Sequence, residues 1–449
     1  MSSSPSSSTD PWFELANGPH TGKTYRQGKS FLIRKHCPPE PFQVNGHYRD
    51  NPRPIADWDL WGARKQYGID RLEFALAYPP MDDESHQHPS TGNDTVLERS
   101  LTITGSKTRR NNDNGSERRG AHVLTCFLDG DATVEYIAKI YDGVDYPGSY
   151  QEPDCMTLAD MDYSIEACAY RNLQSIPGVG GVLVPAYFGS WTFALDVVDP
   201  FAYLGHDHHE NPNADADPNG PAAVARQRWV RMILIELVPG ECLLDMIERA
   251  RVPVPSLEPT LRPTTTTNYS VLPPEAFRIR VIRNIIEADI TIWWEALLTN
   301  HDFHPRNIMV KPDGKVVIID FNHAQLFEFT TYGDVHPRQR EPGHPDALTQ
   351  PESPIERYWA VPFGSVAAGW VGDLWKHWMP ESWVKDPDQA TEWLVATFRD
   401  DTRFAPLGHD FLNCYFRTKC SPRAQKLLED LGRKPAGKGA EKKGKEIDI

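Results

Sequence analysis

The sequence of 449 residues predicts an α+β protein. Strand-like runs rich in β-branched and aromatic residues lie mainly in the first half, at 101–104, 121–128, 133–141, 182–188 and 230–237. Apolar residues at helical spacing predict helices at 159–174, 243–251 and 276–298. The early strands indicate an antiparallel sheet, and the second half is more helical. After Asp320 the chain reads as irregular.

Composition excludes several classes of protein. Hydrophobic residues make up 39% of the chain, which is enough for a sizeable core. A formal net charge of -15 argues against a nucleic-acid-binding surface, because phosphate backbones are bound by clustered Lys and Arg. We interpret the basic runs at 107–110 and 434–445 as a solvated loop and tail. The seven cysteines contain no Cys-x-x-Cys pair, which favours a reducing compartment.

Targeting signals are the next feature. The first twelve residues are Ser-rich and have no basic region followed by an apolar stretch. No stretch approaches 18 uninterrupted apolar residues. We therefore expect no membrane association and a cytoplasmic or nuclear location.

The segment 300–320 carries the strongest chemical pattern, NHDFHPRNIMVKPDGKVVIID. Asp302 is followed five positions later by Asn307, then by an apolar run, an Asp-Gly turn at 313–314 and a strand ending in Asp320. The turn should fold the two short strands antiparallel. Asp302, Asn307 and Asp320 should then converge on one point.

Converging oxygen atoms of this kind suit phosphoryl transfer from ATP. Mg²⁺ prefers hard oxygen ligands, and an attacking hydroxyl needs a carboxylate that orients it and accepts its proton. Asp302 would be the base, and Asn307 and Asp320 would hold the metal. Each residue taken singly would more often have a structural role: Asp302 would cap a turn, Asn307 would lie in a loop and Asp320 would end a strand. The combination in one order favours the functional interpretation.

This stretch resembles the catalytic loop and metal-binding segment of the protein-kinase-like superfamily. Runs such as AKIYD, DYSIEACAY, RMILIEL, PRNIMV and IIDFNHA occur in an order similar to that of kinase-like proteins common in filamentous fungi, over roughly residues 97–330. Aminoglycoside- and choline-kinase-type phosphotransferases are also similar. The resemblance implies a two-lobed fold, with an N-lobe of antiparallel sheet plus a helix and a mainly helical C-lobe.

The same resemblance implies roles for residues outside this stretch. Lys139, in the strand TVEYIAKIYD, would contact the α- and β-phosphates of ATP, and Glu166, 27 positions later in a helix, would pair with it. Glu236, Leu237 and Val238 would offer backbone groups to adenine. Without the resemblance, a strand lysine and a helical glutamate more often face solvent.

The expected organisation follows from these landmarks. Residues 1–95 form a tail and an irregular extension, 96–240 an N-lobe with disordered insertions near 106–120 and 206–226, 241–432 a C-lobe, and 433–449 a disordered Lys-rich tail.

The family pattern is incomplete. No Gly-x-Gly-x-x-Gly precedes Lys139, Asn300-His301-Asp302 replaces the usual His-Arg-Asp or His-Gly-Asp, Asp320-Phe321-Asn322 replaces Asp-Phe-Gly, and no Ala-Pro-Glu follows. Asn322 could stiffen a segment that Gly would let move. An ATP-dependent phosphotransferase acting on a protein or small-molecule hydroxyl is the preferred hypothesis. A pseudokinase that binds nucleotide or serves as a scaffold is the alternative.

Overall fold

The computed structural model describes a large part of the chain, which divides into two compact units. The described residues are 24–43, 48, 72, 75–76, 78–80, 97–107, 120–146, 155–197, 226–254, 264–331, 335–359, 372–408, 411–412 and 421–432. Unit 1 comprises Met1–Pro239, Glu295–Asp302 and Val317–Asp334, and unit 2 comprises Gly240–Trp294, Phe303–Val316 and Val335–Ile449. The first boundary lies close to the predicted boundary after residue 240, but the segments that carry Asp302 and Asp320 belong to unit 1.

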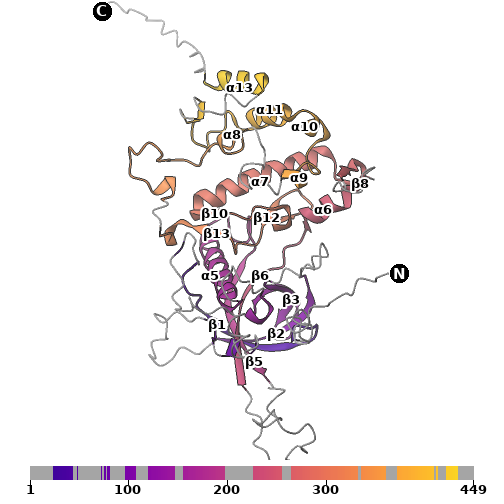
Figure 1. Cartoon of the computed structure of the whole chain (residues 1–449), viewed down its shortest axis with the longest axis vertical. Helices are drawn as coiled ribbons and strands as arrows, with labels where there is room; N and C mark the ends of the chain where they lie inside the picture. Colours follow the sequence, from indigo (N-terminus) through magenta and orange to yellow (C-terminus); the bar gives the residue numbers. More distant parts are fainter. Residues whose placement is uncertain are drawn as a thin grey trace, which may run out of the picture. The chain divides into compact units, whose positions relative to one another are not determined.

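Unit 1 contains a barrel of antiparallel strands (Figure 1). Its strands are β1 (Ser30–His36), β2 (Glu98–Ser106), β3 (His122–Leu128), β4 (Asp131–Tyr141), β5 (Tyr187–Val197) and β6 (Arg226–Glu236). Within the described residues they close in the order β1-β2-β3-β4-β6-β5, because β1 pairs with both β2 and β5. Closure leaves no strand of the barrel as a free edge.

Alternate residues of the strands fill the barrel interior. The buried cluster takes every second position of each strand, including Phe31 and Ile33, Leu101 and Ile103, Leu124 and Cys126, Ala138 and Ile140, Trp191 and Phe193, and Val230 and Met232. Successive side chains of a strand point to opposite faces. Lys139, between Ala138 and Ile140, therefore points out of the barrel.

Helix α5 (Cys155–Gln174) is the long helix of unit 1 and follows the short helix η2 (Gly143–Asp145). Its residues 163–170 are all buried, an unusual pattern for a helix that contains Glu166. The predicted helix at 159–174 is thus confirmed, with an earlier start.

Three short strands lie next to Asp302 and Asp320 in the sequence. Strand β10 (Leu298–Asn300) pairs antiparallel with β13 (Ala324–Leu326), with Asn300 opposite Ala324. Helix η5 (Phe327–Phe329) follows β13. Strand β12 (Val316–Ile318) leads to Asp320, and the Ile318 N–H donates to the Leu183 carbonyl at 2.8 Å. The two loops that carry Asp302 and Asp320 are therefore joined by backbone pairing.

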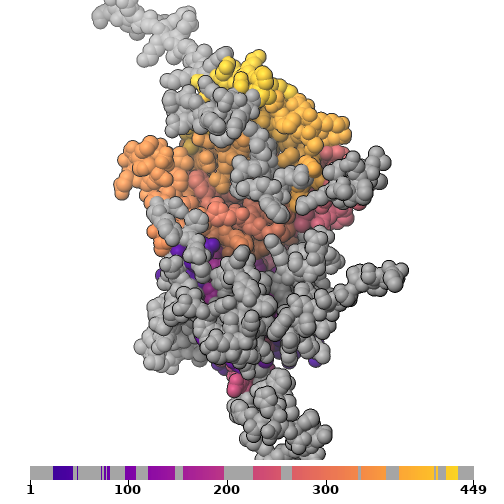
Figure 2. All heavy atoms as spheres, viewed as in Figure 1, coloured from indigo at the N-terminus to yellow at the C-terminus, as the bar shows by residue number. Residues whose placement is uncertain are grey.

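Unit 2 is mainly helical. Its elements are β7 (Glu241–Cys242), α6 (Leu243–Ala250), β8 (Arg251–Val254), β9 (Thr264–Thr267), η3 (Tyr269–Val271), α7 (Glu275–Ala296), η4 (Pro305–Asn307), β11 (Ile308–Val310), η6 (Pro337–Gln339), α8 (Pro354–Arg357), α9 (Gly372–Trp375), α10 (Glu381–Lys385), α11 (Pro387–Phe398) and α13 (Pro422–Gly432). The last two residues of α7 lie in unit 1. The space-filling view shows many of the later residues of unit 2 in orange to yellow (Figure 2).

A buried ion pair helps to hold unit 2 together. Arg357 Nε donates to Asp289 Oδ2 on α7 at 2.9 Å, and the Tyr358 hydroxyl donates to the same oxygen at 2.5 Å. Burial alone would lower the pKa of Arg357, but the Asp289 carboxylate outweighs it and raises that pKa.

Several expectations need correction. Residues 30–36 form a barrel strand, although 1–95 was expected to be irregular. The sheet closes into a barrel. The strand expected at 182–188 begins only at Tyr187, because the Val182 N–H bonds to Val179 in a turn. Past Asp320 the chain is not irregular throughout, because it forms helices such as α11 and α13. Each of these two helices begins at a proline, the residue favoured at the first helical position.

Other expectations fall on residues outside the described ranges. Most of the insertions expected near 106–120 and 206–226, and the tail 433–449, belong there. The helices at 243–251 and 276–298 are confirmed to within about two residues at each end.

Candidate functional site

Lys139, Glu166 and Asp320 form a compact charged cluster in unit 1. Lys139 Nζ donates to Glu166 Oε2 and to Asp320 Oδ1, both at 2.5 Å. The three residues come from β4, α5 and the loop after β12, and Asp320 lies 181 positions from Lys139. The predicted pairing of Lys139 with Glu166 is present in this geometry.

Burial of the charged groups in this cluster costs desolvation free energy. The Lys139 side chain is 10% exposed and that of Glu166 fully buried. An ion pair near 4 Å contributes about 4 kcal/mol at an effective dielectric constant of about 20. Desolvation costs several kcal/mol for each buried ion. One partner would barely compensate this cost, so the second carboxylate matters for keeping Lys139 charged.

The pKa shifts agree with this balance. Burial alone would lower the pKa of Lys139, but Asp320 and Glu166 outweigh it and raise that pKa. Burial raises the pKa of Glu166, which the Lys139 charge opposes. The ammonium of Lys139 is therefore a fixed positive charge at neutral pH.

Further hydrogen bonds fix Glu166 in place. The Tyr141 hydroxyl donates to Glu166 Oε2 at 2.6 Å, and the Phe321 backbone N–H donates to Oε1 at 3.2 Å. The ring of Phe321 is buried and packs edge-on against Tyr170 of α5, with centroids 5.3 Å apart. The segment after Asp320 is thus bound to α5 by its backbone and by its aromatic side chain.

Asp320 itself has an uncommon backbone conformation. Its φ is +65°, in the left-handed region that non-glycine residues rarely adopt. Asp and Asn tolerate this region better than most residues. The carboxylate is 30% exposed, so one face of it can meet solvent or a ligand.

The side chain of Asn300 joins the loops of Asp302 and Asp320. Asn300 Nδ2 donates to the Asp320 carbonyl at 3.3 Å, and Asn300 Oδ1 accepts from the Asp302 N–H at 3.0 Å. His301 Nε2 also lies 2.9 Å from Gln325 Oε1. The structure therefore brings the two aspartate-bearing loops together.

Asn307 belongs to unit 2, and its predicted part in metal binding stays a prediction. It is buried in η4, and its backbone N–H donates to the His304 carbonyl at 2.8 Å. His304 Nδ1 accepts from the Arg306 N–H at 3.0 Å, which is a loop-capping contact. The expected tight turn is present, since the Lys311 N–H donates to the Lys315 carbonyl.

Residues 236–238 were predicted to contact adenine through their backbone. β6 ends at Glu236, whose N–H donates to the Ala186 carbonyl at 2.9 Å. The Glu236 carboxylate accepts from the Ala186 N–H at 3.1 Å. The Glu236 N–H is therefore already used within unit 1, and the contact of residues 236–238 with adenine stays a prediction.

Sequence reasoning missed Asp162, one helical turn before Glu166. Asn322 Nδ2 donates to Asp162 Oδ2 at 3.3 Å, which gives a structural basis for the expectation that Asn322 stiffens its segment. Burial raises the pKa of Asp162 to about 6, against the opposing effect of His323. Its position four residues before Glu166 on one helix face is the signal that could have identified it.

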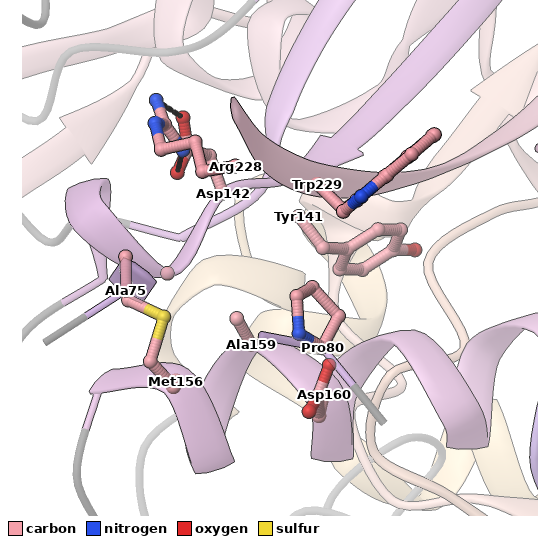
Figure 3. A pocket seen from close by; sticks show the side chains of 10 residues that line it. Ala75, Pro80, Tyr141, Asp142, Met156, Ala159, Asp160, Arg228 and Trp229 are labelled. Carbon is pink, nitrogen blue, oxygen red and sulfur yellow. Dashed lines mark hydrogen bonds and ion pairs between the residues drawn. The ribbon is translucent and has the colours of Figure 1, made fainter. Parts of the chain in front are cut away.

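A small pocket in unit 1 lies apart from this cluster. Figure 3 shows Met156, Ala159 and Asp160 of α5 on one side and the Asp142–Arg228 pair on another. Tyr141 lines it as well, but Lys139, Glu166 and Asp320 do not. Arg228 binds Asp142 with both terminal nitrogens, at 2.5 and 2.7 Å, so this pocket is bordered by a satisfied ion pair.

Two kinds of arrangement are absent from the described residues. Among them, no group of three or more His, Cys, Asp and Glu side chains is arranged to hold a metal ion. No helix in the described part of the chain has the length and apolar character needed to cross a membrane.

Comparisons with known proteins add little. No protein-family model matches the chain, and no curated protein is similar to it. Among solved structures, it is similar to one described as the ROP18 kinase domain in complex with AMP-PNP and sucrose. That similarity has 13% sequence identity and a TM-score of 0.34, and it covers 83% of each chain. Support for a function therefore comes from the geometry of the cluster.

Proposed function

We propose that this protein is an ATP-dependent phosphotransferase that transfers the γ-phosphate to a hydroxyl acceptor. The observation that carries the proposal is the buried Lys139 held between Glu166 and Asp320. A positive charge fixed beside a partly exposed carboxylate suits a triphosphate with its Mg²⁺.

The donor set fits these ligands. A lysine ammonium has three N–H donors, and the described residues use two of them at Lys139. The third can donate to a phosphate oxygen. Asp320 and Asn307 offer the hard oxygen atoms that Mg²⁺ prefers, and Leu237 and Val238 offer backbone groups to adenine.

The residues then divide the work. Mg²⁺, when bound, would neutralise charge on the phosphate oxygens. Glu166 keeps Lys139 in place and charged. Asp302 orients the acceptor hydroxyl and takes its proton. Positioning of this kind accounts for most of the catalysis of phosphoryl transfer, because little covalent chemistry falls to the protein.

A thermal-shift titration with ATP and Mg²⁺ tests the nucleotide site. Ligand at 100 times its dissociation constant stabilises a native protein by about 2.7 kcal/mol. We expect a rise in Tm for the wild type, a much smaller rise for Asp320→Asn, and an unchanged rise for the exposed control Asp346→Asn. No rise in the wild type would refute the proposal.

A turnover assay tests the transfer itself and separates the alternative. ADP release is measured with panels of peptide and small-molecule hydroxyl acceptors, for wild type and Asp302→Asn. Loss of a general base lowers turnover by roughly 10²–10⁴-fold, and we expect Asp302→Asn to keep ATP protection. ATP protection without turnover on any acceptor would favour the pseudokinase. The absence of a glycine-rich motif before Lys139 is the sequence feature that favours this alternative.

A further inference from the structure

A segment near the N-terminus contacts helix α5, which carries Glu166, and strand β13, which begins four residues after Asp320. We call its described residues, 36–43 and 48, the N-terminal strap. It continues directly from β1, so one end of it is fixed in the barrel wall. Lys35 and His36 pair with Trp191 and Ser190 of β5.

The first part of the strap contacts helix α5 on both sides of Glu166. His36 Nδ1 lies 2.6 Å from the Tyr163 hydroxyl oxygen, within hydrogen-bond distance. The Cys168 thiol donates to the Pro39 carbonyl at 3.4 Å. Tyr163 precedes Glu166 by three residues and Cys168 follows it by two. Phe42 is fully buried, which anchors the strap by apolar contact as well.

Tyr48 contacts strand β13, which follows the segment that carries Asp320. Its hydroxyl donates to the Ala324 carbonyl at 2.5 Å and accepts from the Leu326 N–H at 2.7 Å. Tyr48 is 3% exposed, so water cannot readily replace these two bonds. The hydroxyl thus satisfies a backbone acceptor and a backbone donor on one edge of β13, whose other edge pairs with β10.

Hydrogen bonds connect β13 to the backbone around Asp320. The Ala324 N–H donates to the Phe321 carbonyl at 3.0 Å, which closes the turn that follows Asp320. Asn300, opposite Ala324 in the β10–β13 pair, donates to the Asp320 carbonyl. A displaced β13 would therefore shift the backbone that holds Asp320 at its positive φ.

We propose that the N-terminal strap is a positioning element and that Tyr48 is its positioning residue. It ties the helix bearing Glu166 to the segment bearing Asp320, and so sets the geometry of both carboxylates around Lys139. The strap itself does not depend on the proposed function, although its effect on Mg²⁺ binding does.

Hydrogen exchange on the full chain tests the anchor. Tyr48→Phe keeps the ring and removes only the hydroxyl, and Tyr136→Phe on β4 is the matched control. We expect exchange of the Leu326 amide to rise at least 10-fold in Tyr48→Phe and to stay unchanged in Tyr136→Phe. Equal exchange in wild type and Tyr48→Phe would overturn the proposal.

The wild type provides a second measurement if Tyr48→Phe does not fold. Its Leu326 amide should be protected to a degree similar to the Ile235 amide of barrel strand β6. Exchange of Leu326 at the rate of an unstructured peptide would overturn the anchor.

The Mg²⁺ dependence of ATP protection separates positioning from general stability. A purely structural role would lower the Tm of the free protein and leave the half-effective Mg²⁺ concentration unchanged. We expect Tyr48→Phe to raise that concentration several-fold, and an unchanged value would refute positioning. If wild-type protein shows no ATP protection, the proposed function fails, and hydrogen exchange alone decides on the strap.

Discussion

Lys139 Nζ lies 2.5 Å from Asp320 Oδ1, although 181 positions separate the two residues along the chain. The contact joins a barrel strand to the loop after β12. Because Glu166 holds the same ammonium from α5, one lysine connects three elements of unit 1.

Removal of this lysine should destabilise unit 1 strongly. Lys139→Met leaves Glu166 buried without its cationic partner, and breaking a buried pair costs about 3–5 kcal/mol. Urea unfolding measures the loss, and the exposed Lys315→Met serves as control, with an expected change below about 1 kcal/mol. The double variant Lys139→Met, Glu166→Gln should be more stable than Lys139→Met alone, because it removes the unpaired charge. A less stable double variant would contradict the pairing.

Asp162 should make stability depend on pH. Its pKa rises from 3.8 to about 6 on folding, so its protonated form is favoured in the native state. The stability it contributes is complete below pH 4 and is lost as pH rises through 6. The total change is on the order of 3 kcal/mol.

Urea unfolding of wild type and Asp162→Asn between pH 4 and 7.5 measures this change. The free energy of unfolding of Asp162→Asn should rise relative to that of the wild type as pH rises. Asp196→Asn, an exposed strand variant that loses only a contact to Gln227, should follow the wild type across the range. A constant difference between wild type and Asp162→Asn would contradict the raised pKa.

The backbone of Asp320 predicts an order among substitutions. At φ +65°, Asn is tolerated better than Ala, for which the left-handed region costs about 1–2 kcal/mol. Asp320→Asn should therefore be more stable than Asp320→Ala by about 1 kcal/mol in thermal or urea unfolding, although both lose the carboxylate. Asp320→Gly has no such penalty, so its free energy of unfolding should be no lower than that of Asp320→Ala.

Gly240 should tolerate no side chain. Its φ is +153°, and an added Cβ would lie 2.6 Å from the Val310 carbonyl oxygen. Gly240→Ala should destabilise the protein by about 2 kcal/mol or more, because both strain and a backbone clash oppose it. Gly130→Ala is the matched control, since Gly130 also has a positive φ but has open space around it. Equal losses in the two variants would show that the clash is absent.

Much of the fold could be predicted because its signals are local. The strands around Lys139 and the helix of Glu166 follow from the periodicity of nearby residues. Strand β1 was missed because Ser30–His36 is a short run with exposed charges, and only its pairing with β2 and β5 makes it part of the barrel. Tertiary pairing decided what propensity did not.

The candidate site divides in the same way. The Lys139–Glu166 pair was expected from a resemblance to kinase-like proteins and Asp320 from a short motif, and the structure places the three side chains together. The catalytic role of Asp302 and the metal role of Asn307 stay predictions. Asp162 and Tyr48 were missed because their partners, Asn322 and Leu326, lie 160 and 278 positions away. The spacing of Asp162 from Glu166 is a local signal for that residue, but no local pattern encodes the contacts with Asn322 or Leu326.

The sequence by itself therefore determined the strands β3 and β4, the helices α5, α6 and α7, and the motif that ends in Asp320. The strands and helices depend on the periodicity of neighbouring residues, and the motif depends on a fixed spacing along the chain. Only the tertiary structure decided that the barrel closes, that Lys139 has two carboxylate partners, and that the Tyr48 hydroxyl hydrogen-bonds to β13. These features depend on burial, which turns a polar group without a partner into a cost of several kcal/mol and so selects distant residues that can satisfy it.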